Sequence, residues 1–251
     1  MSGSVEWTVA RVTWRLLLGQ RRWILALVAS LLPVLVAWLF VTQGGESNPV
    51  QQANFFVGLM ATLVLTALLP LAGLVHGTAA FGTELDDGTL RYILAKPVAR
   101  WRLVAAKLAT AALATVVTVL PGVVVAAVII FGTPDNWLLR GFAAAVLVGS
   151  VLYAAIFLVL SLLTRRALLI GLLYVIAWEG ALSRAFSGMR SLSVREYAMA
   201  IAEAAAGAPV GGPLQAGLES GTVVWLAVGM LTLATAGAIA RLRVLEVAEE
   251  V

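Results

Sequence analysis

The sequence predicts an all-α polytopic membrane protein with six transmembrane helices, and three observations carry that prediction. Of the 251 residues, 61% are hydrophobic and only 12% are charged, whereas soluble domains carry about a quarter charged residues. The mean hydropathy is +0.99. Nearly charge-free runs recur at about the length that a helix needs to cross a bilayer, where only helices or closed barrels satisfy the backbone. These runs, which we predict as spans within one domain covering 1–251, are 23–41, 55–75, 108–131, 141–163, 167–182 and 223–240.

The segment 4–22, before the first span, has the pattern of an interfacial helix. Its polar residues recur at helical spacing and so share one face; they are Ser4, Thr8, Arg11, Arg15 and Arg22. A helix of this kind lies in the headgroup layer rather than crossing it. The alternative is a frayed basic tail.

The distribution of Lys and Arg predicts the orientation. With both termini cytoplasmic, 13 of the 17 basic residues fall on inner segments, as the positive-inside rule requires. The outer segments keep only Arg140, Arg184, Arg190 and Arg195. We therefore expect a multi-pass protein of a prokaryotic plasma membrane. Because the bases lie at span ends, in contact with membrane lipid, the high pI does not indicate nucleic-acid binding.

The outer segment 193–220, before the last span, is too long for a simple loop. Ser193 and Glu196 form a capping-box pattern that predicts a helix through about Ala206. Gly207 and Pro209 then stop it. A second short helix follows. Whether these helices lie in water or re-enter the membrane is left open by composition.

Glu179 is the one acidic residue inside a predicted span. It lies twelve residues after Ala167, about 18 Å along a helix at 1.5 Å per residue. Two readings remain open: a charge facing a polar cavity, or an interfacial glutamate that pairs with Arg184. The single histidine, His76, is expected to be a packed or interfacial residue.

Several enzyme classes are disfavoured by missing residues. The chain has no cysteine and one histidine, so neither a thiolate metal site nor a histidine cluster can form. No P-loop pattern occurs, so ATP is not bound by that route. We predict no catalytic residue, metal or cofactor in this chain.

A charged island at 83–107, between the second and third spans, holds three acids and five bases. Asp86 and Asp87 suit a helix N-terminus, and Pro97 would end the helix after Lys96. Leu90, Ile93 and Leu94 would share one side of it. Arg100 would meet the headgroups, and Lys107 would snorkel to the interface. The alternative is an ordinary basic loop.

The same island resembles a family signature. The run Glu84…Gly88-Thr89-Leu90…Lys96-Pro97-Val98…Arg100…Lys107 is similar to that of ABC exporter permeases of the second type, in the six-span subgroup without a fused ATPase. The resemblance implies that two permease subunits pair, as a homodimer rather than a heterodimer. It also implies two cytoplasmic ATPase subunits, which bind ATP and Mg²⁺ and drive alternating access.

By this resemblance the island would be the coupling helix that contacts the ATPase. Leu90, Ile93 and Leu94 would anchor it, and Arg91 and Lys96 could pair with acids of the ATPase. The full set of expected coupling residues is Glu84, Asp86, Asp87, Gly88, Thr89, Leu90, Arg91, Ile93, Leu94, Lys96, Pro97 and Arg100.

Two other functions compete with the permease. A partner-independent channel or secondary carrier usually holds several intramembrane ionisable groups, and here only Glu179 qualifies. A membrane-embedded enzyme lacks its metal or nucleophile. The substrate is unreadable, although the few polar side chains in the spans favour an amphipathic or hydrophobic one.

Overall fold

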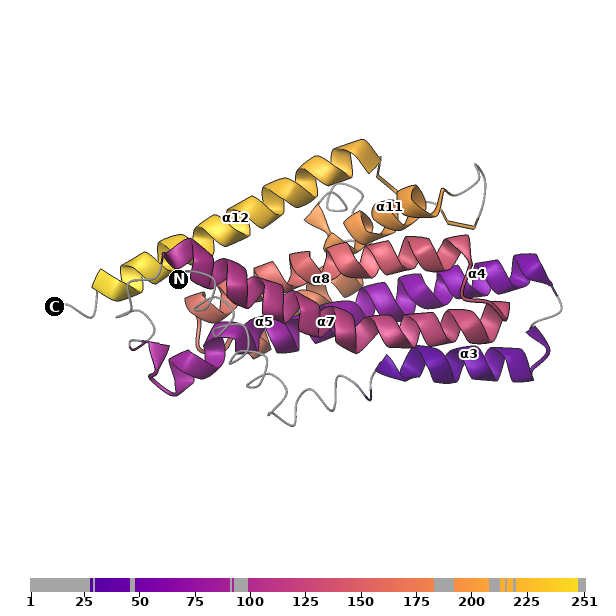
Figure 1. Ribbon diagram of the computed structural model, residues 1–251, viewed down its shortest axis with the longest axis horizontal. Helices are drawn as coiled ribbons and strands as arrows, with labels where there is room; N and C mark the ends of the chain where they lie inside the picture. The colour runs from indigo at the N-terminus through magenta and orange to yellow at the C-terminus, as the bar shows by residue number, and fades with distance from the viewer. Residues whose placement is uncertain are drawn as a thin grey trace, which may run out of the picture.

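A computed structural model describes residues 28, 30–45, 48–90, 92, 99–182, 192–207, 213–214, 216–218 and 220–247. All regular structure within these ranges is helical. The interfacial helix predicted for 4–22 lies outside them. The helices form an elongated bundle in which α12 runs along one side and α3 along the opposite side (Figure 1).

The elements comprise long spans and shorter helices. They are α3 (Leu32–Thr42), α4 (Pro49–Leu59), the π-helix η2 (Met60–Leu68), α5 (Leu69–Asp86), α7 (Arg100–Phe131), α8 (Trp137–Leu163), α9 (Ala167–Tyr174), the π-helix η3 (Val175–Leu182), α11 (Val194–Ala206) and α12 (Ser220–Val247). We call the end where α5 finishes and α7 begins the inner end, at the left of Figure 1, and the opposite end the outer end.

Four helices in the described residues are long and apolar enough to cross a membrane. These are Pro49–Asp86, Arg100–Phe131, Trp137–Leu163 and Gly221–Val244, which correspond to the second, third, fourth and sixth predicted spans. The first and fifth are represented by the shorter apolar helices Leu32–Thr42 and Ala167–Glu179. The protein is therefore an all-helical, multi-pass membrane protein, and four of the six predicted spans reach full length in the described part.

The core forms around α8, and glycines let α5 approach it closely. A Cβ atom built on Gly73 would lie 2.7 Å from the Cβ of Tyr153, and one on Gly77 would lie 2.9 Å from the Cβ of Phe157. Small residues at such contacts allow helix backbones to pack in a membrane. Tyr153 and Phe157 are 0% exposed, so this seam is the centre of the bundle.

Local sequence signals define several helix ends. Asn48 and Asn136 cap α4 and α8 by accepting hydrogen bonds from Val50 and Leu138 backbone N–H groups, each at 2.9 Å. Ser193 caps α11 by accepting one from Glu196 N at 3.4 Å, as predicted. Gly207, at φ +62°, ends α11 in the left-handed conformation.

The position of α11 bears on the choice between water and re-entry. A Cβ on Gly141 would lie 2.5 Å from Ala202 O, and one on Gly149 would lie 3.8 Å from Ala198 Cβ. These two α8 residues lie about 6 Å and about 18 Å from its outer end, counting 1.5 Å per residue. Because α11 runs antiparallel along the outer half of a span, its place in the bundle favours re-entry.

Candidate functional site

A tight turn at Gly88 ends α5 and opens the island. Gly88 has φ +64°, the left-handed region that glycine adopts without strain. Around it, Thr89 N donates to Glu84 O at 2.9 Å and Gly88 N donates to Leu85 O at 3.4 Å. These bonds satisfy the last carbonyl groups of α5, as in a Schellman-type ending.

This turn corrects the predicted role of Asp86 and Asp87. Asp86 is the last residue of α5 and Asp87 is its C-cap, so neither opens a helix. Carboxylates are unfavourable at a helix C-terminus, and here both side chains are exposed, where water screens them. The left-handed conformation of Gly88 ends α5 directly after these two residues, so their preference for a helix N-terminus did not determine where they lie.

The apolar side of the island is only partly where we expected it. Leu90 is 6% exposed and belongs to the same buried cluster as Phe81, Leu103 and Val104. It is therefore not available as an anchor for a partner, and that part of the prediction is wrong. Tyr92 is 64% exposed instead. Thr89 is exposed, and Arg100 is half-buried at the start of α7.

Five of the expected coupling residues lie outside the described residues. They are Arg91, Ile93, Leu94, Lys96 and Pro97. The predicted helix ending at Pro97 can be followed only through Leu90 and Tyr92, both of which are helical.

A buried ion pair joins the two ends of the island. Lys107 Nζ lies 2.5 Å from Glu84 Oε1, donates a short hydrogen bond to Ala80 O and stands 4.7 Å from the centroid of the Phe81 ring. The residue is 1% exposed. The prediction that Lys107 snorkels to the interface is therefore wrong, because a carboxylate on the facing helix meets its ammonium inside the bundle.

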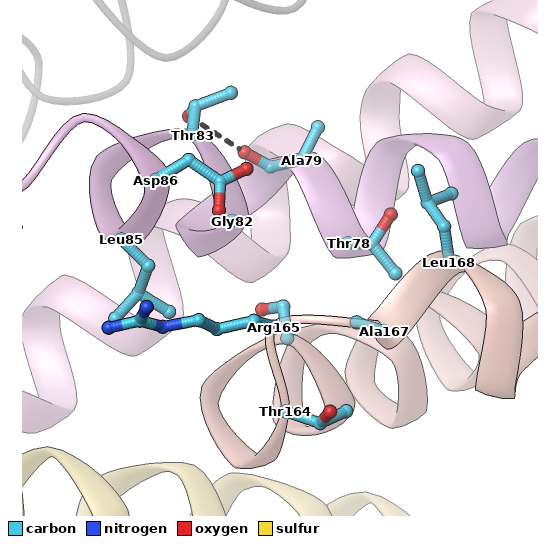
Figure 2. A pocket seen from close by; sticks show the side chains of 11 residues that line it. Thr78, Ala79, Gly82, Thr83, Leu85, Asp86, Thr164, Arg165, Ala167 and Leu168 are labelled. Carbon is cyan, nitrogen blue, oxygen red and sulfur yellow. Dashed lines mark hydrogen bonds between the residues drawn. The ribbon is translucent and has the colours of Figure 1, made fainter.

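A pocket opens between the inner part of α5 and the start of α9. Figure 2 shows it between the inner part of α5 and the turn at 164–166 that joins α8 to α9, with the Arg165 side chain extending toward Leu85. Thr83 Oγ1, on its α5 side, donates to Ala79 O at 3.1 Å. Its polar lining residues are Thr78, Thr83, Asp86, Ser161, Thr164 and Arg165.

Sequence reasoning did not find this pocket. The two sides are about 80 residues apart in the chain, and only the packing of α5 against α8 and α9 brings them together. The one available signal was the basic pair Arg165 and Arg166 between two apolar runs, which by itself indicates only an inner loop.

Glu179 lies in a second polar cluster, toward the outer half. Its carboxylate is 0% exposed and accepts hydrogen bonds from Ser193 Oγ at 2.6 Å, Val194 N at 3.1 Å and Tyr174 Oη at 3.3 Å. An open polar cavity does not fit a carboxylate that is buried and engaged in this way. Arg184, the other partner that we considered, lies outside the described residues.

Arg195 fastens the first turn of α11 to the π-helix η2. Its Nε donates to Thr66 Oγ1 at 3.0 Å, and Nη1 lies 2.5 Å from Glu196 Oε1. Thr66 Oγ1 in turn donates to Ala61 O at 2.8 Å, five residues back. Widened helical turns of this kind free carbonyl groups for other partners, and π-segments are frequent at functional sites.

His76 is a packed histidine, as predicted. It is 3% exposed, and Nε2 lies 3.1 Å from Thr118 Oγ1 on α7. Because the Thr118 hydroxyl donates to Ala114 O at 2.8 Å, it accepts from His76. No group of three or more acidic, histidine or cysteine side chains that could hold a metal ion occurs in the part of the chain that the structure describes.

One comparison with known proteins identifies a family. A family model described as "ABC-2 family transporter protein" matches residues 20–178, which is more than half of the chain and includes the whole island. No curated protein matches the chain.

Proposed function

The chain belongs to the ABC-2 transporter family, and from that membership we propose that it is the transmembrane permease subunit of an ATP-driven exporter. Separate ATPase subunits would bind ATP and Mg²⁺ and hydrolyse the nucleotide. Their movement would switch the spans between inward-open and outward-open states and carry a substrate out. The observation that carries the proposal is the family match, because it runs through the island and the spans on both sides of it.

We assign the ATPase contact to the island at the inner end. Tyr92 and the carboxylates of Asp86 and Asp87 are exposed there, next to the pocket that Asp86 shares with Arg165. A partner that binds here would therefore contact an exposed aromatic side chain and side chains of both positive and negative charge. Tyrosine is among the residues that most often dominate the binding energy of an interface.

We further propose that two copies of the chain pair in the membrane, with two ATPase subunits beneath them. The membrane would be a prokaryotic plasma membrane with both termini on the cytoplasmic side. Basic residues support this orientation, because Arg165 and Arg166 follow α8, Arg241 and Arg243 lie in the last two turns of α12, and both helices finish at the inner end (Figure 1).

Co-purification of a nucleotide-binding subunit tests the proposal. The purified chain alone is expected to hydrolyse no ATP, and activity should appear only with that subunit. Tyr92→Ala should weaken the complex by about tenfold, since truncating a dominant interface residue costs more than about 1 kcal/mol. Trp225→Ala is the matched control, because Trp225 is an exposed aromatic residue (78%) on α12, away from the island.

Two results would count against the proposal. If the chain alone, reconstituted in vesicles, passed ions or solutes without any ATPase, it would be a channel or carrier. If Tyr92→Ala retained the nucleotide-binding subunit at the parent affinity, the exposed side of the island would not be the contact.

A further inference from the structure

We propose that Glu84 and Lys107 are positioning residues that clamp the inner ends of α5 and α7 together, so that the island moves with both helices as one body. We call this contact the clamp. It rests on the proposed function, in that the island is taken to receive the movement of an ATPase. Neither residue is proposed to touch the substrate or the nucleotide.

The contacts of Lys107 are spread over one face of α5. Its ammonium meets Ala80 O, the Phe81 ring and Glu84 Oε1, which lie within about one helical turn of one another. An ammonium group has three N–H donors and can serve several partners at once. A single side chain of α7 therefore fixes α5 against both sliding and rotation.

The location of the clamp suits a mechanical role. Lys107 lies seven residues inside α7, about 10 Å from its first residue at 1.5 Å per residue, and Glu84 lies two residues before the end of α5. The stretch of 22 residues between them holds the last two residues of α5, the connection, and the first seven residues of α7. Joining its ends removes the freedom that a flexible connection of this length would have.

The chain that directly follows α5 is also held to Glu84. The backbone carbonyl of Glu84 accepts from Thr89 N at 2.9 Å, across the Gly88 turn. Leu90 then packs in the same buried cluster as Phe81, Leu103 and Val104. A displacement at Tyr92 would therefore pass through Leu90 and Glu84 to Lys107 and into α7, without a flexible step among the described residues.

A gain in stability alone does not explain why a buried ion pair is present here. Removing two charges from water costs as much as their attraction returns, and apolar pairs of similar volume are often as stable. Charged groups inside a membrane protein are rare and usually functional. Glu84 is 7% exposed and Lys107 is 1% exposed, so this pair meets that description.

Distance measurements between spin labels test the clamp in the full chain. The sequence has no cysteine, so labels at Tyr92→Cys and Ala105→Cys, both exposed positions, report the island relative to α7. The unmodified pair should give a narrow distance distribution. Glu84→Gln and Lys107→Met should each lose that narrow distribution. Arg102→Gln, which removes a positive charge from the same helix, should keep it.

A second pair of labels measures whether movement at the island reaches the outer end. If Glu84 and Lys107 only stabilised the fold, their variants would leave this movement unchanged. Labels at Thr42→Cys and Asp135→Cys, exposed at the outer end, should shift in distance when ATP is added to the complex with its nucleotide-binding subunit. In the clamp variants ATP hydrolysis should continue while this outer shift is lost. Retention of both the narrow inner distribution and the outer shift would overturn the proposal.

The double variant Glu84→Met/Lys107→Met keeps the test decisive if a single variant fails to fold. It leaves no unpaired charge, so it should remain folded yet lose the narrow distribution and the outer shift. If it kept both, the charges would only neutralise each other and the clamp would be refuted. If no nucleotide-binding subunit associates even with the parent chain, the proposed function fails, while the inner labels still decide the clamp.

Discussion

At the scale of single residues, a few buried polar groups join separate elements of this bundle. Glu179 illustrates this, because its carboxylate accepts both the Ser193 hydroxyl and the Val194 backbone N–H. A carboxylate at the first residues of a helix also interacts favourably with the helix dipole. Glu179 therefore holds the start of α11 against the π-helix η3.

Replacing Glu179 should loosen α11. Glu179→Ala leaves the Val194 N–H and the Ser193 hydroxyl buried without this acceptor, which costs about 1–3 kcal/mol for each group. Glu179→Gln keeps an acceptor oxygen and should cost less. Thermal unfolding in detergent, followed by tryptophan fluorescence, would measure the order. Asp135→Ala, at an exposed loop residue, is the control, and equal melting temperatures for all three variants would contradict the assignment.

Residue-scale chemistry is also where sequence reasoning was least complete. Ser193 and Gly207 are local signals, so the limits of α11 could be predicted from a few neighbouring residues. The contact between Glu84 and Lys107 could not, because it joins two helices across 23 positions and depends on how they pack. For the same reason Leu90 was expected on an exposed face and lies in the core.

At the scale of elements, the glycine seam between α5 and α8 determines how closely two spans approach. Gly73 has no room for a side chain, since an added Cβ would lie 2.7 Å from Tyr153 Cβ, whereas Gly58 on α4 has no atom within 4 Å of that position. The two glycines therefore offer a matched comparison.

Alanine at these two positions should have opposite effects. Gly73→Ala forces α5 away from α8 and should destabilise the protein by about 1–3 kcal/mol, as overpacking usually does. Gly58→Ala should stabilise it by about 0.5–1 kcal/mol, because alanine loses less backbone entropy in a helix. Chemical denaturation in mixed micelles would give both values. A neutral Gly73→Ala would mean that the seam can widen without cost.

The Gly88 turn makes a similar prediction for the island. Gly88→Ala places a Cβ in the left-handed region, at a cost of about 1–2 kcal/mol, and should move the chain that follows away from Leu103 and Val104. Gly88→Asn should be milder, because asparagine tolerates that conformation. Affinity for the nucleotide-binding subunit would be the measurement. If the alanine variant bound as tightly as the parent, the conformation of the turn would not matter for the contact with the nucleotide-binding subunit.

At the scale of the whole molecule, composition predicted the class of fold, and four of the six predicted spans reach full length in the described residues. Apolar runs of 20 or more residues give an unambiguous signal for a crossing helix. The run 167–182 is shorter, and in the structure it is divided into α9 and η3 before Glu179 meets α11. Sequence alone gives no indication of that division, because every residue in it except Glu179 is uncharged.

The predicted orientation can be checked in intact cells. Single cysteines at Asp135 and Arg165, both exposed, lie at opposite ends of α8 in a chain that has no other cysteine. A membrane-impermeant maleimide should label Asp135→Cys and leave Arg165→Cys unlabelled until the cells are broken. The reverse pattern would place the island outside the cell, where no ATPase could reach it.

The central position of α8 also has a consequence for how the protein is made. Residues 137–163 are synthesised after α5 and α7, yet Tyr153 and Phe157 fill the seam into which Gly73 and Gly77 fit. The earlier helices must therefore enter the lipid before their contacts with α8 can form. Glu84 with Lys107 and His76 with Thr118 all lie upstream of α8, and both contacts can join α5 to α7 at that stage. Contacts between α5 and α7 can thus form first, and the seam with α8 is completed once α8 leaves the insertion machinery.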